Sequence, residues 1–260
     1  MMRPGSAQSR ALRLLVLGSA LFALTGCVTA KKYRLAKSGS PPVRTLGWSA
    51  SAAPVELTLQ SLIVFKGPGS WKREARWDEY VVLLANRGDQ PVTVTSAVLV
   101  DLQGTPQFPG SDPWTLEKLS RTNWDRYGKT GLKLLAGAGA VLVYGTAVEA
   151  VALGGLMGGG SAGGAVLVLD VIPVVALVDI TAVAIMNHHN KDKVQQEFAR
   201  RRLVLPRTLG PGETVSGSLF FPMTPGPQRL ILKAQSGEGP RELTLGLKPL
   251  ADLHLKPAGK

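Results

Sequence analysis

Apolar and polar residues alternate with a period of two through two stretches of the chain, 55–109 and 203–250. At the start of the first stretch, Val55, Leu57 and Leu59 alternate with polar neighbours. Runs of this kind, bounded by Gly, Pro, Asn and Asp, predict short β-strands. The predicted strands lie at 55–60, 77–85, 92–100, 203–206, 214–221, 228–234 and 242–247. About seven or eight short strands suit an antiparallel β-sandwich.

Neither stretch has enough strands to bury two sheet faces by itself, so we expect the two to form one domain. The predicted fold class is mainly β with an α insertion: a β-sandwich of residues 55–112 and 203–250, split by a long helical hairpin at 113–202. The two edges of the insertion should then lie close together. Residues 27–54 lack apolar periodicity and predict a flexible tether, and 251–260 form a C-terminal tail.

The pattern inside the insertion changes to helical spacing and then to long apolar runs. Asp112 and Pro113 are typical of a helix N-terminus. Two apolar runs follow, 132–153 and 165–186, and each is long enough to cross a hydrocarbon layer of about 30 Å as a helix. A charged helix is predicted at 191–202.

Glycines separate the two apolar runs. Gly155, Gly159 and Gly163 recur every four residues, which on a helix places them on one side and lets a second helix approach closely, as in a glycine zipper. The same glycines are equally consistent with a flexible turn. The sequence therefore predicts a helical hairpin in which the glycines form either a packing surface or the turn between the two helices.

Three acidic residues bear on where the hairpin lies. Glu149, Asp170 and Asp179 are costly in a bilayer, which argues against insertion, whereas the length of the runs argues for it. Two locations stay open, the lipid bilayer and burial against the protein or a second copy. Antiparallel pairing about the glycines would bring Glu149 beside Asp170 and disfavour their joint ionisation, with Asp179 facing another surface. Alternatively, all three acids reach solvent.

The N-terminus has the three parts of a secretory signal: a basic region with three arginines, an apolar region from Leu14, and small residues before a cysteine. The last part reads Leu24, Thr25, Gly26 and Cys27, which resembles a bacterial lipobox. The resemblance implies acylation of Cys27 and removal of residues 1–26, with the outer membrane facing the periplasm as the destination. An ordinary signal peptide or an uncleaved anchor is the alternative.

The charge and the cysteine content of the chain limit the classes of partner that we expect. The full chain has a formal charge of +12, and without residues 1–26 it keeps 27 basic residues against 18 acidic ones. For an exported protein this favours anionic surfaces over nucleic acid. Cys27 is the only cysteine, so no disulfide is expected and the core must stabilise the fold. The expected partners are the lipid bilayer, through acylated Cys27, and a second copy or another envelope protein.

The strand and turn motifs carry a resemblance. The segments Val81–Val92, Asp101–Gly104, Leu209–Glu213 and Gly217–Phe221 resemble the immunoglobulin-like domain of bacterial lipoproteins such as the DUF4352 type. The resemblance implies an Ig-like antiparallel sandwich that serves extracytoplasmic binding or assembly, with no catalytic residues to transfer. The long insertion departs from that type.

Enzymatic chemistry is not expected. Gly159 to Gly163 match G-x-S-x-G around Ser161, but this motif needs a strand–turn–helix within an α/β sheet. Adjacent His188 and His189 point about 100° apart on a helix and do not readily share a metal, and His254 stands alone. No metal and no cofactor are expected. The two hypotheses are a structural or assembly lipoprotein that acts through the hairpin, and a binding module that acts through the sandwich.

Overall fold

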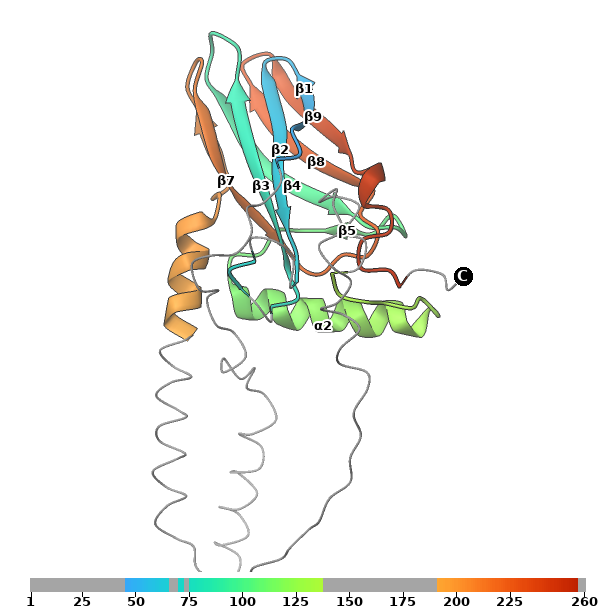
Figure 1. Cartoon of the computed structure of the whole chain (residues 1–260). Coiled ribbons are helices and arrows are strands. Elements are labelled where there is room, and N and C mark those ends of the chain that lie inside the picture. Colours follow the sequence, from blue (N-terminus) through green and yellow to red (C-terminus); the bar gives the residue numbers. More distant parts are fainter. Residues whose placement is uncertain (1–44, 66–69, 73–74, 138–190, 257–260) are drawn as a thin grey trace, which may run out of the picture.

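The computed structural model describes residues 45–65, 70–72, 75–137 and 191–256. The chain in these ranges is mainly β, with antiparallel sheets and two helical segments beside them (Figure 1). The predicted signal peptide, most of the predicted tether and the apolar hairpin segment 138–190 lie outside the described residues.

The first sheet has four strands in the order β1-β2-β3-β7. They are β1 (Trp48–Ala52), β2 (Val55–Ile63), β3 (Asp78–Asn86) and β7 (Thr214–Phe221). Alternate residues of β2 are buried, which is the outcome of its period-two pattern when one face of a strand covers a core. β3 and β7 come from the two separate stretches of alternating sequence and pair along their whole lengths.

The second sheet has β4 at its centre. Its strands are β5 (Pro106–Gln107), β4 (Val92–Val100), β8 (Arg229–Ser236) and β9 (Gly239–Gly246), in that order, and β6 (Arg207–Leu209) also pairs with β4. Each sheet therefore contains strands from both stretches of alternating sequence. A short 3₁₀ helix, Lys248–Leu250, follows β9.

Both sheets contribute to one hydrophobic core. Leu57 and Leu84 of the first sheet and Leu99 and Leu232 of the second are all fully buried in the same cluster. The two sheets thus cover each other's apolar faces, and neither stretch of sequence forms a core alone.

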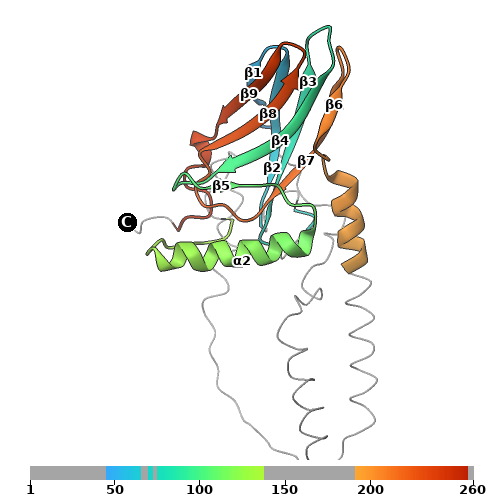
Figure 2. The ribbon, with the colours of Figure 1, turned by 180° about the vertical axis from the view of Figure 1, so that it is seen from behind.

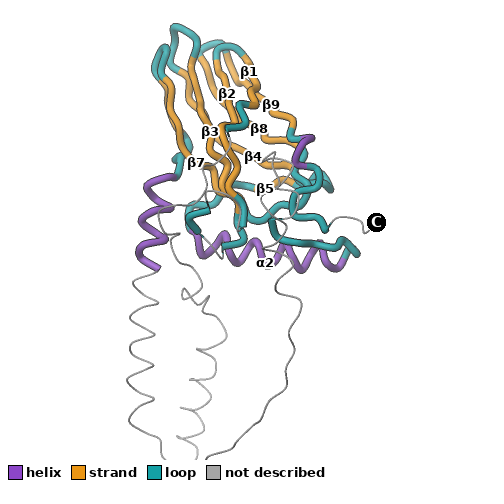
Figure 3. The backbone as a smooth tube through the Cα atoms, viewed as in Figure 1, coloured by secondary structure: helices purple, strands orange, loops and turns teal. Residues whose placement is uncertain are grey.

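The helical segments lie at one end of the sheets, here called the base, where β3 begins and β4 ends (Figures 1 and 3). Helix α2 (Pro113–Lys129) crosses beneath the strands, and residues 191–201 form a second helical segment beside β7 (Figure 2). The Asp112 side chain accepts a hydrogen bond from the Thr115 N–H, so the predicted N-terminus of α2 is confirmed.

A second buried cluster fastens these helices to the first sheet. It consists of Trp71, Ala75, Trp77, Leu116, Val194, Phe198 and Phe220. The ring of Phe198 stacks on Phe220 with centroids 4.1 Å apart and meets Trp77 edge-on at 5.5 Å. Among the described residues, no helix combines the length and apolar character needed to cross a bilayer.

Four boundaries differ from the sequence prediction. The strand predicted at 203–206 is not formed, and the short strand β6 follows it at Arg207–Leu209, because Pro206 has no N–H to donate to a neighbouring strand. Residues 48–52, placed in the flexible tether, form the edge strand β1, because backbone pairing with β2 needs no strong apolar pattern. Residues 113–129 and 191–202, placed in a separable insertion, belong to the folded body, because their apolar faces complete the second cluster. Leu253 and His254, placed in the tail, are buried.

Candidate functional site

Two adjacent acids at the start of β3, Asp78 and Glu79, are the centre of a buried polar cluster at the base. Both side chains are fully buried, and successive residues of a strand point to opposite faces. Asp78 therefore faces one side of the sheet and Glu79 the other, and each holds a different part of the chain. Buried carboxylates persist only where they are hydrogen-bonded or paired.

Asp78 holds the C-terminal turn through His254. The Nε2 atom of His254 lies 2.8 Å from a carboxylate oxygen of Asp78, and both side chains are fully buried. The Gly137 N–H donates to Nδ1 of His254 over 2.9 Å. Since Nδ1 accepts, the proton of the neutral ring is on Nε2, from which it is donated to Asp78.

The segment that leads from α2 is tied to this turn by its backbone as well. The Leu135 N–H donates to the His254 carbonyl, and the Lys256 N–H donates to the Lys133 carbonyl. Gly137 has a φ of +79°, and a Cβ at this position would lie 2.5 Å from the carbonyl oxygen of Phe65. Glycine is thus required at the last described residue before 138.

Glu79 binds side chains on the opposite face of the first sheet from Asp78. One carboxylate oxygen accepts from the Trp71 indole N–H at 2.6 Å, and the other accepts from the Ser218 hydroxyl at 2.7 Å. The second oxygen also lies 3.5 Å from the guanidinium of Arg201, in the helical segment 191–201. Arg201 pairs in addition with Glu197.

Glu197 is itself held by arginine. The hydrogen bond from Arg200, with a further one from Arg201, lowers the pKa of Glu197 to about 2. Just past the helical segment, the Leu203 N–H donates to the Ser218 carbonyl at 2.9 Å. The chain that returns from residue 190 is therefore fixed to β7 and β3 by charged and backbone contacts.

Lys72 is a buried cation in the same cluster. Its side chain is fully buried, with the ammonium 4.0 Å from the centroid of the Trp77 ring, and it has no hydrogen-bond partner among the described residues. Burial lowers its pKa from 10.5 to about 8, although the charges of Asp78, Glu79 and Glu117 oppose the shift. The lysine offsets the negative charge of the two β3 acids at a cost in desolvation.

This geometry is suited to holding chain segments in place. Both ring nitrogens of His254 are engaged, so neither is available to take a proton from a substrate. Within the described ranges, no three His, Cys, Asp or Glu side chains come together as a metal-binding group. Asp78 and Glu79 secure the chain on either side of residues 138–190, and we call this cluster (Lys72, Asp78, Glu79, Arg201 and His254) the base clamp.

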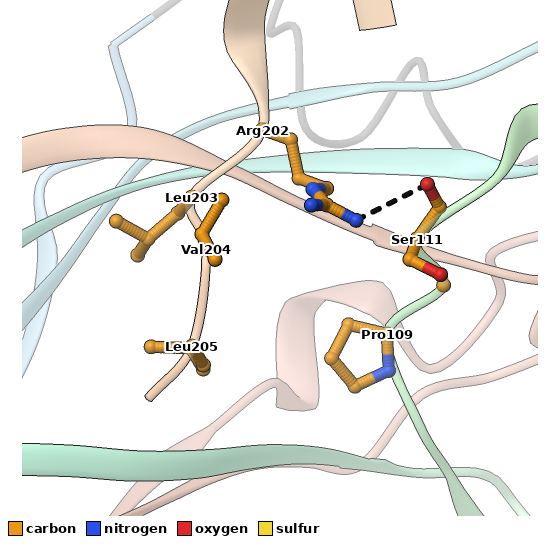
Figure 4. Close-up of a pocket in the computed structure, with 7 residues that line it drawn as sticks. Pro109, Ser111, Arg202, Leu203, Val204 and Leu205 are labelled. Carbon is orange, nitrogen blue, oxygen red and sulfur yellow. Dashed lines mark hydrogen bonds between the residues drawn. The ribbon is translucent and has the colours of Figure 1, made fainter. Parts of the chain in front are cut away.

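A pocket of about 120 Å³ lies near the helical segment 191–201, where the chain passes between β5 and α2 (Figure 4). Its lining residues are Pro109, Gly110, Ser111, Arg202, Leu203, Val204 and Leu205. The Arg202 guanidinium donates to the Ser111 carbonyl at 3.1 Å. The two edges of the predicted insertion, 113 and 202, therefore lie close together.

The residues singled out by sequence lie mostly elsewhere. The lipobox residues Leu24, Thr25, Gly26 and Cys27, the glycines 155, 159 and 163, and the acids Glu149, Asp170 and Asp179 fall outside the described residues. The sequence analysis missed the base clamp except for noting His254. The sequence signal that could have revealed the base clamp is the pair of acids directly after Trp77, at the start of an apolar strand. Acids in such a position are buried only where they have polar partners.

Comparison of the chain with protein-family models, curated proteins and solved structures gave no match.

Proposed function

We propose that the protein is a membrane-anchored lipoprotein of the bacterial cell envelope with a structural or assembly role. Its sequence supports an acylated Cys27 as the anchor. The apolar segment 138–190 acts as a helical hairpin that mediates oligomerisation or enters the membrane, with Gly155, Gly159 and Gly163 as its packing surface. Residues 55–112 and 203–250 supply an Ig-like sandwich, a proposal supported by the two-sheet core and by the resemblance to the DUF4352 type.

The base clamp is the observation that carries the proposal. Asp78 with His254 secures Gly137, and Glu79 secures Arg201, so the described residues on both sides of 138–190 are held at the same end of the body. An apolar segment whose two described flanks lie at one end of a folded body suits a protein that works at a membrane.

The anchor is tested with Cys27→Ala in the native host. Acylation predicts that the wild-type chain fractionates with membranes and carries acyl chains on Cys27 in mass spectrometry. The Cys27→Ala protein should lose both the modification and N-terminal processing. A Cys27→Ala protein that is processed and localised like wild type would overturn the lipoprotein assignment.

The role of the hairpin is tested by replacing residues 138–190 with a linker of about 20 Gly and Ser residues, long enough to span folded parts flexibly. Crosslinking in the membrane should show oligomers for the wild type and monomers for the variant if the hairpin mediates assembly. If the hairpin enters lipid, carbonate extraction of unacylated chains should leave the wild type in the membrane and release the variant. Identical behaviour in both assays would contradict a hairpin role.

The pocket at the edges of the insertion supports the alternative, a binding module for a partner protein or an anionic envelope polymer. Val204 in its wall is 55% exposed, and Phe108, just before Pro109, is 62% exposed. Exposed apolar side chains beside a pocket are typical of protein contacts. Replacement of 138–190 abolishes an assembly function of the hairpin and leaves partner binding at this pocket intact, which distinguishes the two.

A further inference from the structure

Helix α2 is fixed rigidly to the body through a polar face. Asn123 donates to the Met223 carbonyl at 3.1 Å, and the Ser120 hydroxyl accepts from the Met223 N–H at 2.9 Å. One helical turn further on, the buried Tyr127 hydroxyl donates to the buried carboxylate of Asp101. The orientation of the opposite face is therefore set by the fold.

That opposite face is basic. Lys118 and Lys129 are eleven residues apart, which on an α-helix places them within about 20° of one another, and both are exposed. Arg121 is exposed on the same side, and Lys133 is exposed just beyond the helix. Asp125 is the one exposed acid of α2 and lies on this face, and Arg121 pairs with the buried Glu117 at 3.4 Å, so the net positive charge of the face comes from its lysines.

Apolar groups accompany these charges. Leu119 is 44% exposed, and among the described residues only Phe108 and Val204 are large apolar side chains with comparable exposure. Half-buried Trp124 lies about 120° from Lys118 around the helix, on the margin opposite to Leu119, and half-buried Trp114 lies between Lys118 and Arg121. A helix with a basic face accompanied by leucine and tryptophan is typical of the interface between water and lipid headgroups.

The position of α2 at the base indicates a membrane surface as the partner of its basic face. The helix lies across the base (Figures 1 and 2). Asn123 and Ser120 hold its buried face to the body, so its basic face points away from the sheets. The described chain on both sides of 138–190 also lies at the base. An anchor or hairpin that engages a bilayer from this end brings the basic face of α2 against its surface.

We propose that the basic face of α2 (Lys118, Arg121 and Lys129, with Lys133) binds the anionic headgroups of a bilayer, so that α2 lies flat on the membrane surface. The lysine ammonium groups pair with lipid phosphates, and Leu119 lies at the margin of the contact. The inference rests on the proposed envelope function and adds the lipid class to it. It needs no contribution from the acyl chains.

The test uses the mature chain from residue 27 with Cys27→Ser, so that no acyl chain contributes. Binding to vesicles of phosphatidylcholine is compared with binding to vesicles that also contain phosphatidylglycerol. The unaltered face should favour the anionic vesicles, and the preference should fall with added salt. Lys118→Gln, Lys129→Gln and Lys133→Gln together should weaken binding to anionic vesicles by about 100-fold, since each lysine near the surface contributes about fivefold.

The matched control removes three exposed basic residues of the sheets away from the base, with Arg87→Gln, Arg207→Gln and Lys233→Gln. It lowers the net charge equally and should keep at least a third of the anionic preference. Equal loss in both triple variants, or no preference for anionic vesicles at the start, overturns the proposal. The acylated triple variant of Lys118, Lys129 and Lys133 should still fractionate with membranes, because Cys27 holds it there. This outcome distinguishes a failure of headgroup binding from a failure of the lipid anchor.

Discussion

At the scale of single residues, the buried pair of Asp78 and His254 fastens the chain before residue 138 to β3. His254 has a φ of +62°, a conformation that asparagine tolerates better than most residues. In His254→Asn the shorter side chain keeps an acceptor near Gly137 but no longer reaches Asp78. We expect a loss of about 2–4 kcal/mol in the free energy of unfolding, because the Asp78 carboxylate stays buried without its donor.

Denaturant melts of a double-mutant cycle check this expectation. Adding Asp78→Asn to His254→Asn should restore part of the lost stability, since the unpaired charge is then gone. The nearby exposed Asp252→Asn should change stability by less than about 0.5 kcal/mol. Fully additive effects of the two clamp substitutions would show that Asp78 and His254 do not stabilise each other.

Lys72 makes stability depend on pH in a defined direction. Its pKa is about 8 in the folded protein and 10.5 ordinarily, so between these values the unfolded chain binds a proton that the folded chain does not. Lys72 therefore contributes a rise in stability with pH in this window, of about 2 kcal/mol from pH 8 to pH 10, which the raised pKa values of Tyr80 and Tyr127 oppose toward pH 10. Lys72→Met should lose this rise, whereas exposed Lys118→Met should keep it. Thermal melts across the window that give the same slope for both variants would contradict the assignment.

At the scale of elements, the helical segment 191–201 is part of the body because Phe198 packs against both Trp77 and Phe220. Phe198→Ala should destabilise the protein by about 3–5 kcal/mol, since it removes a fully buried aromatic ring. Phe108→Ala, at a mostly exposed position, should fall within about 0.5 kcal/mol of wild type. Chemical denaturation provides the comparison, and similar small effects at both positions would mean that the segment is not packed as described.

At the scale of the whole molecule, the folded body includes both helical segments but does not depend on residues 138–190 for its described contacts. Replacing 138–190 by the Gly-Ser linker should change the free energy of unfolding by no more than about 2 kcal/mol, because loop closure depends weakly on length. Replacing 113–202 should prevent stable folding, because it removes Leu116, Tyr127 and Phe198 from buried positions. Circular dichroism and denaturant melts of both variants decide whether the insertion begins at 113 or after 137.

The sequence by itself determined the strands with a strong period-two pattern. β2 and β4 follow from alternation, and β3 and β7 follow from apolar runs bounded by turn residues. The start of α2 likewise follows from Asp112 and Pro113, whose capping chemistry is local. β1 was missed because an edge strand of small residues is held by backbone pairing with β2, a contact that local pattern does not encode.

Only the tertiary structure decided the base clamp. Asp78 and His254 are 176 positions apart, and Glu79 meets Ser218 over 139 positions, so no spacing rule connects them. The same holds for the second core cluster, in which Trp77 meets Phe198 and Phe220 from distant parts of the chain. Burial of a charge is settled by which distant partner reaches it, and that depends on how the two sheets and the helices close around the base.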